Sequence, residues 1–164
     1  MPPVLHLDPS QLDLSRVLVD REAIRRVNPQ RFEMEQLTAI VHLDSEHHVI
    51  AGYKDVRDDE FWVRGHMPEY PLMPGVLMCE AAAQLCSYYT FSQGLCRGDF
   101  IGFGGMEDVR FRGVVRPGDR LVLIGKAMRI HRRQTIFDVQ GFVGSTMVFH
   151  ANIHGVPMTR KEEA

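Results

Sequence analysis

The sequence predicts an α+β protein in which a long antiparallel sheet wraps around one central, almost entirely apolar helix. Residues 74–93 read as a helix whose core, VLMCEAAAQLCSYYTFSQ, is apolar nearly all round, so it should be buried on most sides. Residues 100–156 hold four successive strand-like runs separated by turn signals, which is typical of an antiparallel meander. Such a helix and such a sheet bury each other when the sheet curls around the helix.

Length and composition are those of a single globular domain, residues 1–164, with 45% hydrophobic and 24% charged residues. The beginning of the chain, MPPVLHLDPSQLD, has acids and prolines but no basic start before an apolar run, which argues against a signal peptide. Three cysteines without a C-x-x-C pair predict reduced thiols. We therefore expect a cytoplasmic protein. Glu80, Gln84 and Ser87 interrupt the apolar helix, which argues against a membrane span.

The elements before the helix are predicted from two patterns. Residues 9–27 place spaced apolar residues among many charges, which predicts one or two short surface helices in an N-terminal helical extension, 1–27. Residues 37–43 and 47–56 are rich in β-formers and are split by Asp44-Ser45-Glu46, which predicts a hairpin.

The helix and the strands after it have clear boundaries. Pro74 suits the first helical position and Gly94 suits the position after the last turn. At 1.5 Å per residue the helix spans about 28 Å. The predicted strands are 100–111, 120–130, 134–144 and 146–156, with the turn RPGD before the second.

One carboxylate, Glu80, lies inside this apolar helix. Burying a lone carboxylate is costly, so it should be neutral, paired or placed at a cavity. A carboxyl group in an apolar cavity can serve as a general acid near neutral pH. Gln84, four residues later, shares its face of the helix. The alternative is a narrow polar stripe that faces water.

A histidine and a helix start lie close by in the sequence. His66 stands between a glycine and a loop stiffened by three prolines, and histidine exchanges protons readily at physiological pH. A loop histidine that caps a strand end is an equal alternative. The N–H groups of Gly75 and Val76 begin the helix and favour negative charge, such as that on a polarised carbonyl oxygen. Together these groups fit proton abstraction next to a carbonyl with loss or gain of water.

Other signals exclude several function classes. His150 and His154 share one strand face about 13 Å apart, too far to bind one metal ion. Residues 1–108 hold 9 basic and 17 acidic side chains, and residues 109–164 hold 10 basic and 4 acidic. The basic half could attract an acidic partner or could be a solvated strand face. No basic helix or aromatic-interleaved motif indicates nucleic-acid binding.

Two segments resemble a known family. GHMPEYPLMPGVLMCEAAAQ, residues 65–84, resembles the active-site signature G-H-x-P-x-x-P-x-x-P-G-V-L-x-x-E-A-x-A-Q of the 3-hydroxyacyl-[acyl-carrier-protein] dehydratases of type II fatty acid synthesis. VRFRGVVRPGDRL, residues 109–121, resembles their segment R-F-[KR]-x-x-V-x-P-G-D. The likeness covers roughly residues 28–156. It implies a hotdog fold, a homodimer or a hexamer of three dimers, and dehydration of a (3R)-3-hydroxyacyl thioester to the trans-2-enoyl thioester with no cofactor and no metal.

The resemblance also implies roles for four residues. His66 would remove the α-proton, and Glu80 would protonate the departing hydroxyl, directly or through water. The Gly75 N–H would hold the thioester carbonyl, and Gln84 would orient Glu80. In such dimers, the His66 and the Glu80 of one site come from different chains.

The implied partner is an acyl carrier protein that carries the hydroxyacyl chain. Its acidic surface would meet basic residues near the tunnel mouth, and the candidates are Arg110, Arg112, Arg132 and Arg133. Glutamate at position 80 resembles the branch that only dehydrates, because the branch that also isomerises typically has aspartate there.

The chain departs from the family pattern at two places. Glu69-Tyr70 replaces the usual glycine plus variable residue, and NPQRFEMEQLTAIV stands where the family has a run of the type L-P-H-R-x-P-F-L-L-V-D. Two other functions fit the same residues. The first is acyl-thioester hydrolysis on the same fold. The second is a non-catalytic acyl-binding subunit that partners a paralogous dehydratase.

Overall fold

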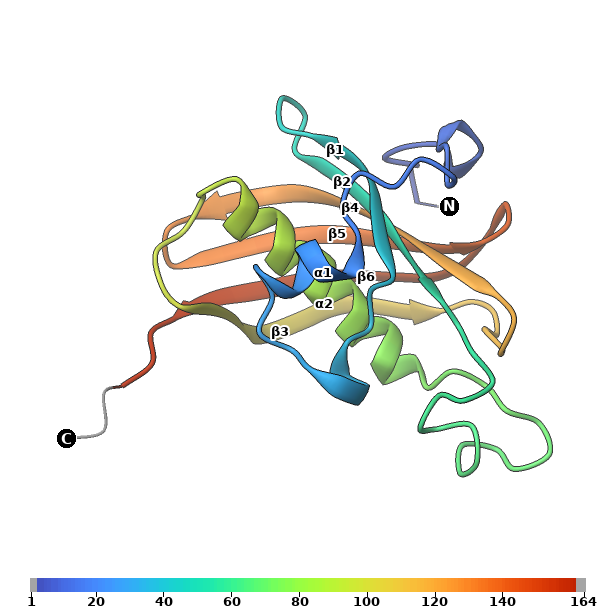
Figure 1. Cartoon of the computed structure of the whole chain (residues 1–164). Coiled ribbons are helices and arrows are strands. Elements are labelled where there is room, and N and C mark those ends of the chain that lie inside the picture. Colours follow the sequence, from blue (N-terminus) through green and yellow to red (C-terminus); the bar gives the residue numbers. More distant parts are fainter. Residues whose placement is uncertain (1–2, 162–164) are drawn as a thin grey trace.

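The computed structural model describes residues 3–161 as a curved six-stranded antiparallel sheet around one long helix (Figure 1). The helical elements are η1 (Pro9–Gln11), α1 (Arg21–Arg25), η2 (Phe32–Met34) and α2 (Gly75–Ser92). The strands are β1 (Ala39–Asp44), β2 (Val49–Asp55), β3 (Phe100–Phe111), β4 (Arg120–His131), β5 (Gln134–Val143) and β6 (Thr146–Met158).

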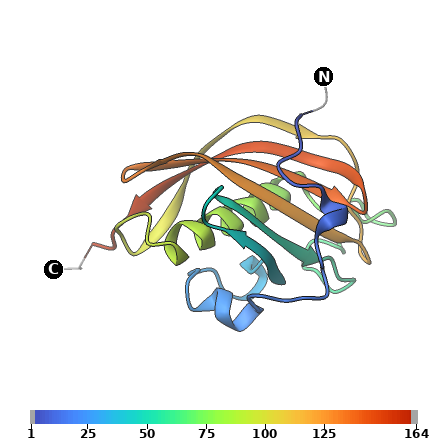
Figure 2. The same ribbon diagram turned by 90° about the horizontal axis from the view of Figure 1, so that it is seen from above.

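The central helix α2 lies in the concave side of the sheet, as Figure 2 shows. Pro74 has extended backbone angles and precedes the helix as its cap, so the first helical residue is Gly75. Most of α2 is buried, including the polar Gln84 and Ser87. Among residues 3–161, none of the helices combines the length and apolarity that crossing a membrane requires.

The sheet order is β1-β2-β4-β5-β6-β3, and every pairing is antiparallel. The predicted hairpin is β1–β2, and β4–β5–β6 is a meander. The expectation that all four later strands form one sequential meander is wrong, because β3 pairs with β6 and β4 pairs with β2. Hydrophobic periodicity identifies strands but carries no information on which strands pair. β3 is therefore an edge strand with one side free of backbone partners among the described residues.

A second hydrophobic cluster lies on the outer face of the sheet. Residues 3–18, here called the N-terminal strap, cross this face (Figure 2), and Leu7, Leu12 and Leu14 pack against it. Gln140 fixes the strap by donating to the Val4 carbonyl at 2.8 Å. Within residues 3–27 the predicted helical extension contains only the short η1 and α1, and most of the strap lies outside helices and strands. Its leucines therefore cover sheet rather than line a helix.

Candidate active site

The loop before α2 fixes the position and the tautomer of His66. The His66 N–H donates to the carbonyl of the buried Trp62 at 2.7 Å, and the His66 Nδ1 lies 2.7 Å from the Leu72 carbonyl oxygen. A carbonyl oxygen can only accept, so Nδ1 carries the proton. In the neutral ring the lone pair is then on Nε2. The loop thus prepares Nε2 to accept a proton.

His66 and Gly75 line the same cavity, of about 360 Å³, at the start of α2. The ring of Phe111 lies over Gly75, and a Cβ built there would be 2.7 Å from the Phe111 Cζ. Among the described residues, no acceptor is within hydrogen-bonding distance of the Gly75 or Val76 N–H. Two free donors of the helix start therefore lie beside His66 in a mostly apolar cavity.

Glu80 is held by a network that reaches across the chain. Gln84 Nε2 donates to Glu80 Oε1 at 2.8 Å and to the Met34 carbonyl at 2.6 Å. Gln84 Oε1 accepts from the Gln36 N–H at 2.9 Å, and Asn28 donates to the Gln84 carbonyl at 2.9 Å. Because the Gln36 N–H can only donate and the Met34 carbonyl can only accept, the Gln84 amide has one orientation. The contact leaves Glu80 Oε2 as the oxygen free to carry a proton.

Glu80 lines a different cavity from His66. This smaller cavity, of about 60 Å³, lies between α2, β3 and β6. Its wall includes Ser87 and Cys86 of α2. A single chain therefore brings together His66 with Gly75, and Glu80 with Gln84, but it does not place all four around one cavity.

The cysteines of α2 do not supply a nucleophile. Cys79 and Cys86 are both buried in the core cluster. Burial raises the pKa of the Cys79 thiol to about 11 and raises the pKa of the Cys86 thiol further. Both remain protonated thiols near neutral pH, and the protonated form is a poor nucleophile.

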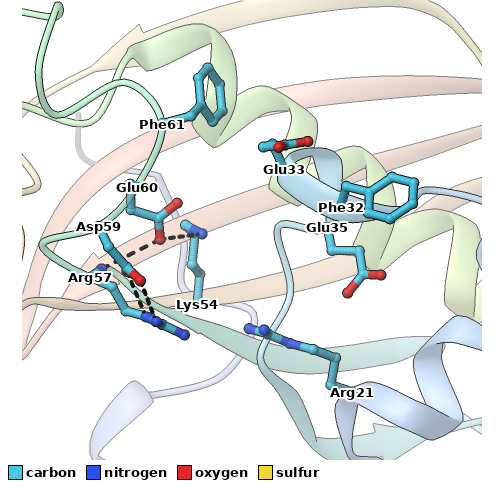
Figure 3. Close-up of a pocket in the computed structure, with 9 residues that line it drawn as sticks. All are labelled: Arg21, Phe32, Glu33, Glu35, Lys54, Arg57, Asp59, Glu60 and Phe61. Carbon is cyan, nitrogen blue, oxygen red and sulfur yellow. Dashed lines mark hydrogen bonds and ion pairs between the residues drawn. The ribbon is translucent and has the colours of Figure 1, made fainter.

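Another cavity, of about 340 Å³, has a wall of mixed charge (Figure 3). Figure 3 shows Lys54 against Glu60 and Arg57 against Asp59. The Lys54 side chain is only 4% exposed, and its Nζ lies 2.8 Å from the Glu60 carboxylate. This cavity contains none of the four predicted site residues, and its charges largely neutralise one another.

The four candidate arginines for an acidic partner do not form one patch. All four are exposed. Arg110 and Arg112 are next to Phe111 in the sequence, but neither lines the cavity of His66, and Arg112 lines a separate cavity beside the N-terminal strap. Arg132 and Arg133 lie in the β4–β5 turn, about 25 Å away along the sheet as judged from the strand register.

Comparison with known proteins places the chain in a family. Residues 28–152 match the FabA-like domain. The chain belongs to the FabA-like family. Its relatives include the 3-hydroxyacyl-[acyl-carrier-protein] dehydratase FabZ of Streptococcus agalactiae serotype V, with 37% identity over 123 residues, covering 75% of this chain and 85% of the relative. The FabZ of Clostridioides difficile is 32% identical over 131 residues, covering 80% of this chain and 92% of the relative.

Solved structures show that this FabA-like chain has the hotdog fold. The dehydratase heterocomplex ApeI:P from Xenorhabdus doucetiae matches with a TM-score of 0.66 at 13% identity, covering 82% of this chain and 90% of that one. Cj0977, a sigma28-regulated virulence protein from Campylobacter jejuni, matches with a TM-score of 0.63 at 18% identity, covering 89% of this chain and 95% of that one.

Some contacts of this FabA-like site are not apparent from the sequence. The backbone of residues 34–36 holds Gln84, and this is the segment where the chain departs from the family run. Tyr70, the other departure, lies under the Arg116 guanidinium, and the Arg116 Cζ is 4.1 Å from the centroid of the Tyr70 ring. In the sequence, only the departures from the family pattern point to these contacts, because the contacts join residues far apart in the chain.

Proposed function

We propose that this chain dehydrates (3R)-3-hydroxyacyl chains on an acyl carrier protein to the trans-2-enoyl product. The observation that carries the proposal is the His66 tautomer: Nε2 is free to accept a proton in the cavity that also holds the Gly75 N–H. A base beside an oxyanion donor suits removal of a proton next to a thioester carbonyl. The FabZ relatives are named for this reaction.

Each residue then has one step. His66 Nε2 takes the α-proton, and the Gly75 N–H stabilises the negative charge that develops on the thioester oxygen. Glu80 gives a proton to the hydroxyl at C3, which leaves as water. Gln84 keeps the Glu80 carboxyl group in place through Oε1, so that the transferred proton comes from Oε2. The two protonation states are restored by exchange with solvent.

A homodimer would complete the site. The free edge of β3 runs past both cavities: Phe111, near its end, lines the cavity of His66, and Phe103, near its start, lines that of Glu80. If two β3 edges pair antiparallel about a two-fold axis, the start of one strand lies beside the end of the other. That pairing brings His66 of one chain toward Glu80 of its partner, and three such dimers could form a hexamer.

The acidic carrier protein would meet the end of β3. Arg110 and Arg112 are exposed and adjoin Phe111, which lines the cavity of His66, whereas Arg132 and Arg133 are distant from it. Such a carrier-dependent reaction would take place in the cytoplasm.

The reverse reaction, hydration of an enoyl thioester on carrier protein, tests the proposal. Loss of the conjugated enoyl absorbance should be catalysed by wild type and should fall by about 100-fold or more in His66→Ala and in Glu80→Gln. Glu46→Gln, in the β1–β2 turn, and His131→Ala, at the end of β4, are exposed and should keep wild-type rates. A folded wild-type protein that hydrates no substrate would contradict the proposal. Release of free thiol that depends on Glu80 but not on His66 would instead indicate a thioesterase.

A further inference from the structure

The cavity of Glu80 contains buried polar atoms without partners. Ser87 Oγ, Gln30 Oε1 and His154 Nε2 are all buried, and none has a hydrogen-bond partner among the described residues. Ser87 is only 3% exposed. His154 Nε2 is 3.7 Å from the Glu107 carboxylate, beyond hydrogen-bonding distance. A fourth polar side chain, Thr135, lines the same cavity.

The position of Ser87 connects these atoms to the reaction. Glu80 and Ser87 are seven residues apart and lie on one face of α2, with Ala83 between them. Ser87 is therefore about 10 Å further along the helix than the proposed acid. An acyl tail whose C3 hydroxyl meets Glu80 and which follows this face of α2 passes Ser87.

A plain alkyl tail fits this wall poorly. It would bury the three polar atoms permanently without a partner, which is energetically unfavourable for each of them. Alanine at position 87 would avoid that cost. The rest of the wall is apolar and suits methylene groups: Ala83, Ile101, Phe103 and Ile153. An alkyl tail that carries a hydroxyl group suits both the apolar and the polar parts of the wall. The hydroxyl can donate to an acceptor such as Gln30 Oε1 and accept from a donor such as Ser87 Oγ.

We propose that the acyl tail taken by this site carries a hydroxyl group that hydrogen-bonds with Ser87 and the polar atoms around it. The proposal rests on the dehydratase function proposed above and specifies its substrate class: acyl thioesters oxygenated in the tail in addition to C3. Ser87 acts as a specificity-determining residue and takes no part in the proton transfers.

Paired substrates test this inference on the wild-type protein. Enoyl thioesters of equal length are compared, one with a plain tail and others with a hydroxyl moved stepwise along it. At the matching position we expect kcat/KM to exceed that of the plain substrate by about tenfold, the value of one hydrogen bond to a buried group. In Ser87→Ala this preference should shrink at least about threefold, with the plain substrate turned over as well as before or better. Ser92→Ala, an exposed serine of the same helix, should keep the wild-type preference.

The outcomes separate the two proposals. Turnover of the plain substrate that equals or exceeds that of every hydroxylated one overturns the inference and leaves the dehydratase function intact. An unchanged preference in Ser87→Ala also overturns it. If no substrate of either kind is hydrated by folded protein, the dehydratase proposal fails and the inference fails with it.

Discussion

Two residues in the loop after His66 adopt a backbone conformation that L-residues disfavour. Met67 and Glu69 have φ of 60° and 70°, in the left-handed region that costs about 1–2 kcal/mol per residue. Neighbouring contacts hold the loop in place, among them the Met73 N–H to the Val115 carbonyl at 2.7 Å. The family typically has glycine where this chain has Glu69, and the φ value gives the physical reason for that glycine.

Glu69→Gly should therefore stabilise the protein. The relief of about 1–2 kcal/mol exceeds the entropy cost of a new glycine, about 0.5–1 kcal/mol, so the free energy of unfolding should rise by about 0.5–1 kcal/mol. Urea unfolding measures it. Asp58→Gly, at an exposed position without a left-handed φ, should instead lower stability. An equal shift in both variants would show that Glu69 is not strained.

Gly75→Ala should separate stability from activity. The three atoms nearest to the new Cβ all belong to the ring of Phe111, a residue that is 51% exposed and whose ring can move aside, and alanine is the better helix former. Stability should therefore change little. The methyl group would lie beside the N–H that we propose binds the thioester oxygen, so kcat/KM for hydration should fall by about 100-fold.

Gly125→Ala is the matched control for this substitution, because a Cβ there meets no atom closer than 3.6 Å, and it should retain activity. Full activity in Gly75→Ala would contradict the placement of the thioester carbonyl directly against Gly75.

The sequence predicts the local part of this site and misses the part made by distant contacts. Glu80 and Gln84 share a helix face by their spacing, and their hydrogen bond follows from it. The partner of Gln84 Oε1 is the Gln36 N–H, 48 residues away, and no local pattern encodes it. The proton on His66 Nδ1 likewise depends on how the proline loop presents the Leu72 carbonyl.

At the scale of elements, the strand positions follow from periodicity, but strand neighbours and the strap do not. The pattern of residues 100–111 predicts a half-buried strand but does not indicate its neighbour. The pairing of β3 with β6 at the edge arises only when the sheet closes around α2. The strap looks like a charged surface segment in sequence. Leu7, Leu12 and Leu14 are partly buried because the outer face of β1, β2 and β4 is itself apolar, with Val41, Tyr53 and Ile124 among its residues.

One carboxylate should make the attachment of this strap sensitive to acid. Asp138 Oδ1 lies 3.1 Å from His6 Nε2 on the strap and 3.2 Å from His150 Nε2 on β6. Burial opposes ionisation of Asp138, but its contacts with His6 and His150 outweigh burial and lower the pKa of the carboxyl group. A lowered pKa stabilises the fold above the ordinary carboxyl pKa of about 3.9, and this stability is lost as the pH falls through the folded pKa.

Asp138→Asn should therefore lower the free energy of unfolding by roughly 1–3 kcal/mol at pH 7, and its difference from wild type should shrink below about pH 4. Urea unfolding of both proteins at pH 7 and near pH 3.5 measures this, with Asp58→Asn as an exposed control. A difference that stays constant with pH would mean that the ionised carboxylate does not contribute.

At the scale of the whole molecule, the separation of the two cavities is the feature from which we infer a site shared between two chains. His66 and Glu80 are close in sequence, yet the fold places them on different cavities that the edge strand β3 connects. If a complete site takes His66 from one chain and Glu80 from its partner, two inactive variants can restore each other. A dimer of one His66→Ala chain and one Glu80→Gln chain has one doubly altered site and one intact site.

Unfolding and refolding an equal mixture of the two variants should therefore recover about a quarter of wild-type hydration activity, because half of the dimers are mixed and half of their sites are intact. Each variant refolded alone should stay inactive. Differently tagged chains and co-purification would confirm that mixed dimers form. Mixed dimers without activity would show that each chain builds its own site, in which case the loop of His66 would have to move toward Glu80 within one chain for the reaction to occur.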